Sequence, residues 1–301
     1  MAPASASIRR ARPLLGTFVE IGIAQASLAD ADAAVEAAFA AVAKVHALMS
    51  FHEPGSDVSR LNREACERDV EVDPWTFEVL QAALDLNRRS AGAFDVTVAP
   101  VLEALGLLPR TGRPSAPVRP AGGEVIELSA DRRVRFRDRG VRIDLGGIAK
   151  GFAVDRAVAT LREHGVCGGI VNAGGDLAAF GLQPQSIDIR DPADPRRLIC
   201  RTQIRDEALA TSGARLDLHR SDAAEETAVI DPAAGRPAQA MRGASVRAPS
   251  CLLADALTKV VMVAGETSRE LLDDCHANAL VVLSDGTIRV TRGWDAAGLA
   301  A

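Results

Sequence analysis

The sequence predicts an α+β fold of mixed, mostly antiparallel sheets with packed helices, and two observations favour this class. Segments with the alternating pattern of strands and segments with helical periodicity occur in mixed order, not in a regular strand–helix–strand alternation. Several strand segments also follow one another through short turns, as antiparallel hairpins do. With 301 residues, of which 48% are hydrophobic, the chain can bury a sizeable core as one large domain or two.

The first third of the chain predicts one strand and two helices. The expected elements are a strand at 18–23, a helix at 27–49, a polar loop at 50–56, a polar turn at 59–62 and a helix at 74–90. The second helix has the clearest start, because Asp73 can cap it and Pro74 suits its first position. Asp95 follows this helix between apolar neighbours, and it is either a turn-forming residue or a carboxylate that faces a ligand.

The stretch 141–181 concentrates residues that folding alone does not require. A predicted strand at 141–145 runs into Gly146-Gly147, and a helix follows that ends at Gly165. Glycines at such a junction let backbone amides approach a ligand, and a helix N-terminus attracts phosphate. Lys150 lies in the first helical turn, where an anion would compensate its unfavourable position.

A second glycine turn follows a short apolar run in the same stretch. Its polar and glycine members are Asn172, Gly174, Gly175 and Asp176. The two turns together suggest a cradle for a pyrophosphate, although either turn is also an ordinary tight connection, since neither has the spacing of a dinucleotide or Walker motif. Asp155, further along the helix, could pair with Arg156 or a neighbour at the surface.

The remaining elements are shorter. Strands are expected at 125–128, 134–136, 187–189, 198–204, 280–283 and 288–290, a short strand before a turn at 211–213, another at 227–230, a helix at 250–265 and a short helix from 268. Residues 1–13 are expected to be a disordered N-terminal segment and 294–301 a C-terminal tail, so that the domain spans 14–293.

Composition and charge exclude several classes of function. The net charge of −5 without a basic block argues against nucleic-acid binding, and no apolar run is long enough for stable membrane insertion. The N-terminus lacks the apolar region of a secretion signal, so a cytoplasmic location is the default expectation. The five cysteines are widely spaced, which indicates neither a disulfide framework nor a zinc site.

A series of short motifs in fixed order resembles the ApbE family of FAD:protein FMN transferases. The motifs are LGT at 15–17, MS at 49–50, SRLN at 59–62, GAFDVT at 92–97, IDLGGIAKG at 143–151, NAGGD at 172–176, TSG at 211–213, IDP at 230–232 and ADAL at 254–257. The resemblance implies a flavin-binding domain related to the T-fold. It also implies a magnesium-dependent reaction, in which FMN passes from FAD through its phosphate to a threonine or serine of a target flavoprotein and AMP leaves.

The resemblance also implies roles for particular residues. Catalytic roles fall on Asp255, Asp231 and Lys150, and magnesium would be held by Asp255 and a backbone carbonyl near Gly147, since this ion prefers oxygen ligands. Asp95 and Asp255 are not expected to be core residues. Contacts to FAD are expected from Leu15, Ser50, Phe51, His52, Asp95, Lys150, Asn172, Gly174, Gly175, Asp176, Thr211, Ser212, Gly213 and Val229. The protein would act as a monomer or homodimer on its acceptor flavoprotein, and the family often acts in the periplasm or at the outer face of the inner membrane.

Three positions depart from the family pattern. His52 stands where an aromatic residue usually stacks on the flavin, and Ala228 stands where a histidine is thought to activate the acceptor hydroxyl, a role that His219 could take over. Lys259 occupies the position of the usual threonine ligand of the metal, with Thr258 one place away, and its ammonium could itself fill the cation site. These departures keep two alternatives open, an FAD-binding protein without transferase activity and a slow FAD pyrophosphatase.

Overall fold

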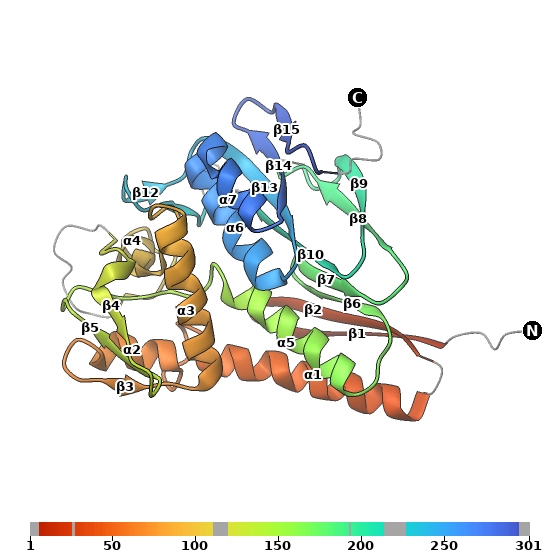
Figure 1. The fold of residues 1–301 in the computed structure, drawn as a ribbon, viewed down its shortest axis with the longest axis horizontal. Coiled ribbons are helices and arrows are strands. Elements are labelled where there is room, and N and C mark those ends of the chain that lie inside the picture. Colours follow the sequence, from red (N-terminus) through yellow and green to blue (C-terminus); the bar gives the residue numbers. More distant parts are fainter. Residues whose placement is uncertain (1–5, 26–27, 111–119, 193, 214–226, 295–301) are drawn as a thin grey trace, which may run out of the picture.

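An eight-stranded antiparallel sheet forms the centre of the structure, which is a computed structural model that describes residues 6–25, 28–110, 120–192, 194–213 and 227–294 (Figure 1). Its strands, in spatial order, are β1 (Ala6–Leu14), β2 (Thr17–Gln25), β6 (Gly169–Ala173), β7 (Asp176–Phe180), β10 (Glu207–Gly213), β13 (Met241–Ala248), β14 (Asn278–Leu283) and β15 (Ile288–Val290). Every neighbouring pair is antiparallel. The prediction of an α+β fold with mostly antiparallel sheets is confirmed.

Three helices cover one face of this sheet and a hairpin covers the other. The helices are α1 (Leu28–Met49), α5 (Ala149–Glu163) and α6 (Cys251–Ala264), which lie side by side in that order. Because side chains alternate along a strand, Ala208 and Ala210 of β10 join the main core under the helices, whereas Leu209 faces the other way. There it packs under the hairpin of β8 (Gln185–Arg190) and β9 (Leu198–Ile204).

Smaller elements gather at the left of Figure 1, at the end of the sheet where α5 begins. They are α2 (Asp57–Glu64), α3 (Pro74–Arg89), η1 (Val96–Val98), α4 (Ala99–Ala104), η2 (Gly123–Val125) and the three-stranded sheet of β3 (Val70–Glu71), β5 (Arg133–Phe136) and β4 (Ile126–Leu128). The remaining elements are the short hairpin of β11 (Ile230–Asp231) and β12 (Arg236–Pro237), then η3 (Gly265–Ser268) and α7 (Arg269–Asp274). Asp73 accepts a hydrogen bond from the Trp75 N–H at 2.9 Å, so the predicted cap of α3 is confirmed.

The structure differs from the sequence-based expectations in several places. Residues 6–13, expected to be disordered, belong to β1, which pairs with β2 along its whole length. The polar turn at 59–62 is part of α2, which Ser56 caps through the Ser59 N–H at 3.0 Å. The long strand β13 was not expected, and Trp294, placed in the tail, is buried under the β8–β9 hairpin.

A further difference concerns the strand expected at 141–145. This segment is extended but joins no sheet, because its polar backbone groups find other partners. The Asn62 side chain donates to the Ile143 carbonyl at 2.9 Å and accepts from the Ile143 N–H at 2.8 Å. The next amide, of Asp144, donates to the Val96 carbonyl at 2.9 Å. The apolar alternation therefore reflects burial of Val141, Ile143 and Leu145, not strand pairing.

Candidate active site

The fold brings together two lysines and two aspartates from three separate segments. Lys150 lies in the first turn of α5, Asp176 begins β7, and Asp255 and Lys259 lie one turn apart on α6. Lys150 Nζ forms an ion pair with Asp176 Oδ2 and lies 3.6 Å from Asp255 Oδ2. We call these four residues the lysine–aspartate cluster.

A close approach of two helices places Asp255 in this cluster. At Gly151 an added Cβ would lie 2.1 Å from the carbonyl oxygen of Cys251, so only glycine allows α5 and α6 to approach this closely. Asp255 is completely buried, and its Oδ2 accepts a hydrogen bond from the Gly151 N–H at 3.0 Å. The expectation that Asp255 lies outside the core is therefore wrong. Asp95, 9% exposed, is also buried.

Lys259 binds the same aspartate from the next helical turn. Its Nζ forms an ion pair with Asp255 Oδ1 and donates to the Asp255 carbonyl at 2.9 Å. The two residues are four apart in the sequence and therefore lie on one face of the helix. The Thr258 hydroxyl donates to the same Asp255 carbonyl at 2.7 Å and also lies 2.7 Å from the hydroxyl of Ser212.

Opposite charges decide the protonation of the cluster. Burial alone would raise the pKa of Asp255, but the ammonium groups of Lys150 and Lys259 together with the Gly151 N–H lower it below its ordinary value. The pKa of Lys150 is raised, because Asp255 and Asp176 outweigh the effect of burial. Burial and the charge of Asp255 raise the pKa of Asp176, against the effect of Lys150. Both Lys150 and Asp255 are therefore charged at neutral pH.

The donors around Asp255 do not fit magnesium as they are arranged. Magnesium requires near-octahedral oxygen coordination, yet Lys259 already binds Asp255 Oδ1 and the carbonyl, and Gly151 binds Oδ2. Gly147, expected to supply a carbonyl ligand, lies against the stem of Lys259, whose Cε is 3.5 Å from the position a Cβ would take. Within the residues that the structure describes, no three His, Cys, Asp or Glu side chains form a metal-binding group.

Two turns of the sheet lie beside the cluster and carry further predicted FAD contacts. Leu15 and Gly16 form the two-residue β1–β2 turn with φ values of 56° and 70°, as a hairpin of this length requires. In the β6–β7 turn, Gly174 has a φ of 66°, and a Cβ there would lie 2.5 Å from Thr17 Oγ1. Asn172 Oδ1 accepts the Gly175 N–H at 2.9 Å and so fixes the turn that leads to Asp176.

Asp95 acts as a turn former in this structure. Its Oδ1 accepts hydrogen bonds from the Thr97 N–H at 2.7 Å and the Thr97 hydroxyl at 2.8 Å, and burial raises its pKa. The segment lies close to the cluster, since Val96 binds Asp144 and the Phe94 ring lies 3.6 Å from the Cβ position at Gly147. The turn-forming alternative is thus observed, and the ligand-facing role stays a prediction.

The predicted flavin contacts at the end of α1 form a tight loop. Ser50 Oγ accepts the His52 N–H at 3.2 Å, and the Ser50 carbonyl accepts the Ser56 hydroxyl at 2.7 Å. His52 is exposed, Phe51 is half-buried, and their rings meet edge to face. The charge of His52 acts on Asp144, which places this loop near the glycine junction before α5.

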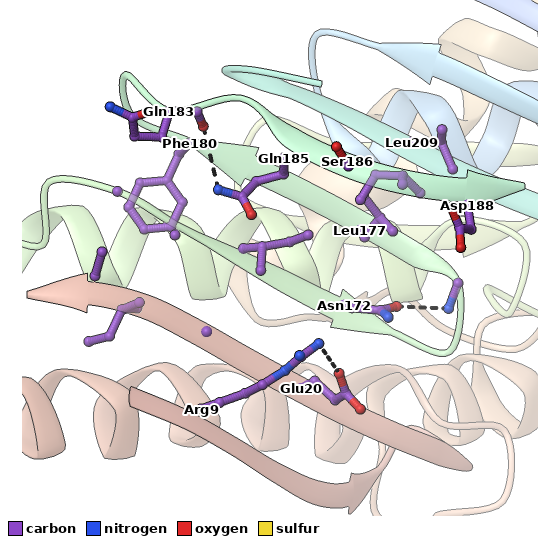
Figure 2. A pocket seen from close by; sticks show the side chains of 18 of the residues that line it. Arg9, Glu20, Asn172, Leu177, Phe180, Gln183, Gln185, Ser186, Asp188 and Leu209 are labelled. Atoms are coloured by element: carbon purple, nitrogen blue, oxygen red, sulfur yellow. Dashed lines mark hydrogen bonds and ion pairs between the residues drawn. The ribbon is translucent and has the colours of Figure 1, made fainter. Parts of the chain in front are cut away.

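The predicted turn at Thr211, Ser212 and Gly213 is the end of β10, and its residues face opposite sides of the sheet. Ser212 faces α6 through Thr258, whereas Thr211 bonds Ser245 at 2.8 Å and lines a cavity of about 1030 Å³ on the other face. Figure 2 shows this cavity between the sheet and the β8–β9 hairpin, with Asn172, Leu177 and Asp188 around it.

Asp231 lies in a turn of its own. Its Oδ1 accepts the N–H groups of Ala233 and Ala234 at 3.0 and 3.1 Å, while Val229 is buried in the main core. Among the described residues, no hydrogen bond or ion pair joins Asp231 to the lysine–aspartate cluster, although β11 contacts α6. Ala228 is exposed, and His219 lies outside the described residues.

Sequence reasoning missed two residues that shape the site. Asp144 is partly buried beside Gly146, whose N–H donates to its Oδ2 at 3.1 Å, and burial raises its pKa against the charges of His52, Lys150 and Lys259. Its place in the IDLGG motif was the available signal. No sequence signal pointed to Asn62, which holds the segment that carries Asp144, because its partner Ile143 lies 81 residues away in the sequence.

Comparisons with known proteins identify the family of this chain. The family model described as the ApbE family matches residues 15–282. The chain is 28% identical to the FAD:protein FMN transferase of Treponema pallidum, over 94% of this chain and 86% of that protein. It is 32% identical to that of Rhodobacter capsulatus, over 84% of this chain and 50% of that protein.

Solved structures show the same fold. An ApbE protein from Thermotoga maritima has a TM-score of 0.84 at 28% identity, covering 95% of this chain and 97% of its own. The flavin transferase ApbE from Vibrio cholerae has a TM-score of 0.79 at 26% identity, and the match covers 96% of this chain and 97% of the Vibrio chain. With its motifs, its fold and a family match over most of its length, this chain belongs to the ApbE family.

Proposed function

We propose that this protein transfers the FMN half of FAD to a threonine or serine hydroxyl of an acceptor flavoprotein and releases AMP. The observation that carries the proposal is the lysine–aspartate cluster, in which the ammonium groups of Lys150 and Lys259 lie beside two glycine turns. Such an arrangement suits a pyrophosphate, because ammonium groups bind phosphate oxygens and glycine turns let a ligand approach the backbone closely. The names of the relatives support the same reaction.

The proposed step forms one phosphoester bond and breaks one anhydride bond. The acceptor hydroxyl oxygen attacks the phosphorus of the FMN half, the bridging P–O bond breaks, and AMP leaves with the electron pair. In phosphoryl transfer the protein contributes mainly by positioning the groups and stabilising charge. Lys150 and Lys259 would hold the phosphate oxygens, while Asp255 holds the two lysines.

The hydroxyl proton needs an acceptor, and we assign this role to Asp144. The position of the family histidine is Ala228, which cannot take a proton, and Asp255 is unsuitable because its lowered pKa keeps it a weak base. Asp144 has a raised pKa and a single hydrogen bond, from Gly146, to its carboxylate among the described contacts. Asp144→Asn should lower the transfer rate by roughly 100-fold and leave the Kd for FAD unchanged. An unchanged rate would remove Asp144 from this role.

The reaction is tested by incubating the protein with FAD and a peptide-tagged acceptor. Protein-bound flavin is read by in-gel fluorescence, and AMP by chromatography. We expect labelled acceptor and AMP in equal amounts, and no label on an acceptor whose target hydroxyl residue is replaced by alanine. AMP with free FMN but no label would instead indicate a pyrophosphatase, and bound FAD without AMP would indicate a flavin-binding protein. Either result would refute transfer.

A further inference from the structure

We infer that the Lys259 ammonium is the fixed cation of this site and replaces a divalent metal ion, so that FAD binding does not require magnesium. This inference rests on the proposed function for the identity of the ligand. It predicts that magnesium and chelators change the affinity for FAD little.

The first argument is that Lys259 uses the oxygen atoms that a metal ion would need. A single Nζ donates to both Oδ1 and the carbonyl oxygen of Asp255, which are two of the oxygen atoms that a metal ion could bind on this helix turn. A metal ion could bind here only if the ammonium moved away. An ammonium has three N–H donors, so one remains for a phosphate oxygen.

The second argument concerns charge. Two lysines and two aspartates give the cluster a formal charge of zero, so each of its carboxylates already has a counter-charge, and the nearby Asp144 interacts with the same two ammonium groups. A divalent ion beside Asp255 would lie within a few ångströms of two ammonium groups, at a distance where like charges repel strongly in a partly buried site.

The third argument is which members of the cluster are accessible. The Lys150 and Lys259 side chains are 32% and 17% exposed, whereas Asp176 and Asp255 are 3% and 0% exposed. An approaching ligand therefore meets two ammonium groups, with the carboxylates behind them. This surface favours a pyrophosphate and leaves no accessible carboxylate of the cluster for a metal ion.

The fourth argument is the choice of lysine. Of the 35 lysine and arginine residues in the chain only three are lysines, namely Lys44, Lys150 and Lys259, and two of these meet in the cluster. Elsewhere the chain uses arginine, whose planar guanidinium needs more room and binds side-on. A compact ammonium is the side-chain cation closest in form to a metal ion, which explains its use at this position.

The test compares the wild type with Lys259→Thr, and uses Lys44→Thr as the matched control, since Lys44 pairs with Asp73 far from the cluster in sequence. Binding of Mn²⁺ is followed by electron paramagnetic resonance, and the Kd for FAD is measured by flavin fluorescence in Mg²⁺ and in EDTA. Thermal unfolding confirms that each variant is folded.

We expect that wild type and Lys44→Thr bind no Mn²⁺ at the site and have the same Kd for FAD in both buffers. Lys259→Thr should gain one Mn²⁺ site and bind FAD about tenfold more weakly in EDTA than in Mg²⁺. A wild-type Mn²⁺ site that Asp255→Asn removes would overturn the inference, as would a Lys259→Thr protein without a new site. If no variant binds FAD, the proposed function fails, and Mn²⁺ binding still decides the role of Lys259.

Discussion

Asp255 is the residue on which the site depends most. It meets three groups, the Gly151 N–H, the Lys150 ammonium and the Lys259 ammonium, and no part of it is exposed. A buried carboxylate in this position is tolerated because each oxygen has a donor. Its structural and its proposed functional roles are therefore inseparable.

We predict that Asp255→Asn lowers the free energy of unfolding by about 3 kcal/mol, because it leaves two partly buried ammonium groups without their shared counter-charge. Urea denaturation at neutral pH measures the change. The control is Asp206→Asn, since Asp206 pairs with Arg162 at the exposed surface and such pairs contribute about 0.5 kcal/mol. Equal losses in the two variants would show that the cluster does not stabilise the fold.

The junction of α5 and α6 is the element-scale feature that builds the site. Asp155 of α5 accepts the N–H groups of Cys251 and Leu252 at 2.8 Å each and so caps α6 across the helix pair, together with Ser250. The alternative from the sequence, in which Asp155 pairs with Arg156 or a neighbour at the surface, is not observed among the described residues. One turn earlier, Gly151 provides the close contact that lets this cap form.

Gly151→Ala is predicted to destabilise the protein by about 2 kcal/mol, because the methyl group would overlap the Cys251 carbonyl and force the helices apart. Thermal and urea unfolding report the loss, and binding of FAD should weaken with it. Gly55→Ala is the matched control, since no atom lies within 4 Å of its Cβ position. A Gly151→Ala protein as stable as this control would contradict the observed helix contact.

Asp155 should make stability depend on pH. Burial raises its pKa to about 6, although the Leu252 and Cys251 N–H groups oppose the shift. Because the folded state binds the proton more tightly, this contribution is present below about pH 4 and is lost as the pH rises through 6, by roughly 3 kcal/mol in total. Asparagine does not titrate. Denaturation from pH 4 to 7 should therefore show wild type losing stability relative to Asp155→Asn, and a constant difference would refute the assignment.

At the scale of the whole molecule, local patterns predicted most helices but only four strands of the large sheet, namely β2, β10, β14 and β15. They failed where tertiary contacts decide. The segment of β1 looked disordered because Arg9, Arg10 and Arg12 dominate it, yet each pairs with an acidic residue of β2 or α1. The motifs identified many of the site residues, but the sequence did not predict which of them contact one another. The hydrogen bond from the Gly151 N–H to Asp255 joins residues that are 104 positions apart in the sequence, and a local sequence pattern cannot predict such a contact.

Because the site is assembled from segments across the chain, its ligand should stabilise the whole fold, and FAD should do so more than FMN. A pyrophosphate offers two phosphate groups to Lys150, Lys259 and the glycine turns, whereas FMN offers only one. At a hundredfold excess over its Kd, FAD would add about 2.7 kcal/mol, which raises the unfolding temperature by roughly 5 °C for a chain of this size. FMN at the same concentration should raise it less, and Lys150→Met should reduce the difference. Equal shifts for the two flavins, measured by differential scanning fluorimetry, would show that the cluster binds one phosphate and not two.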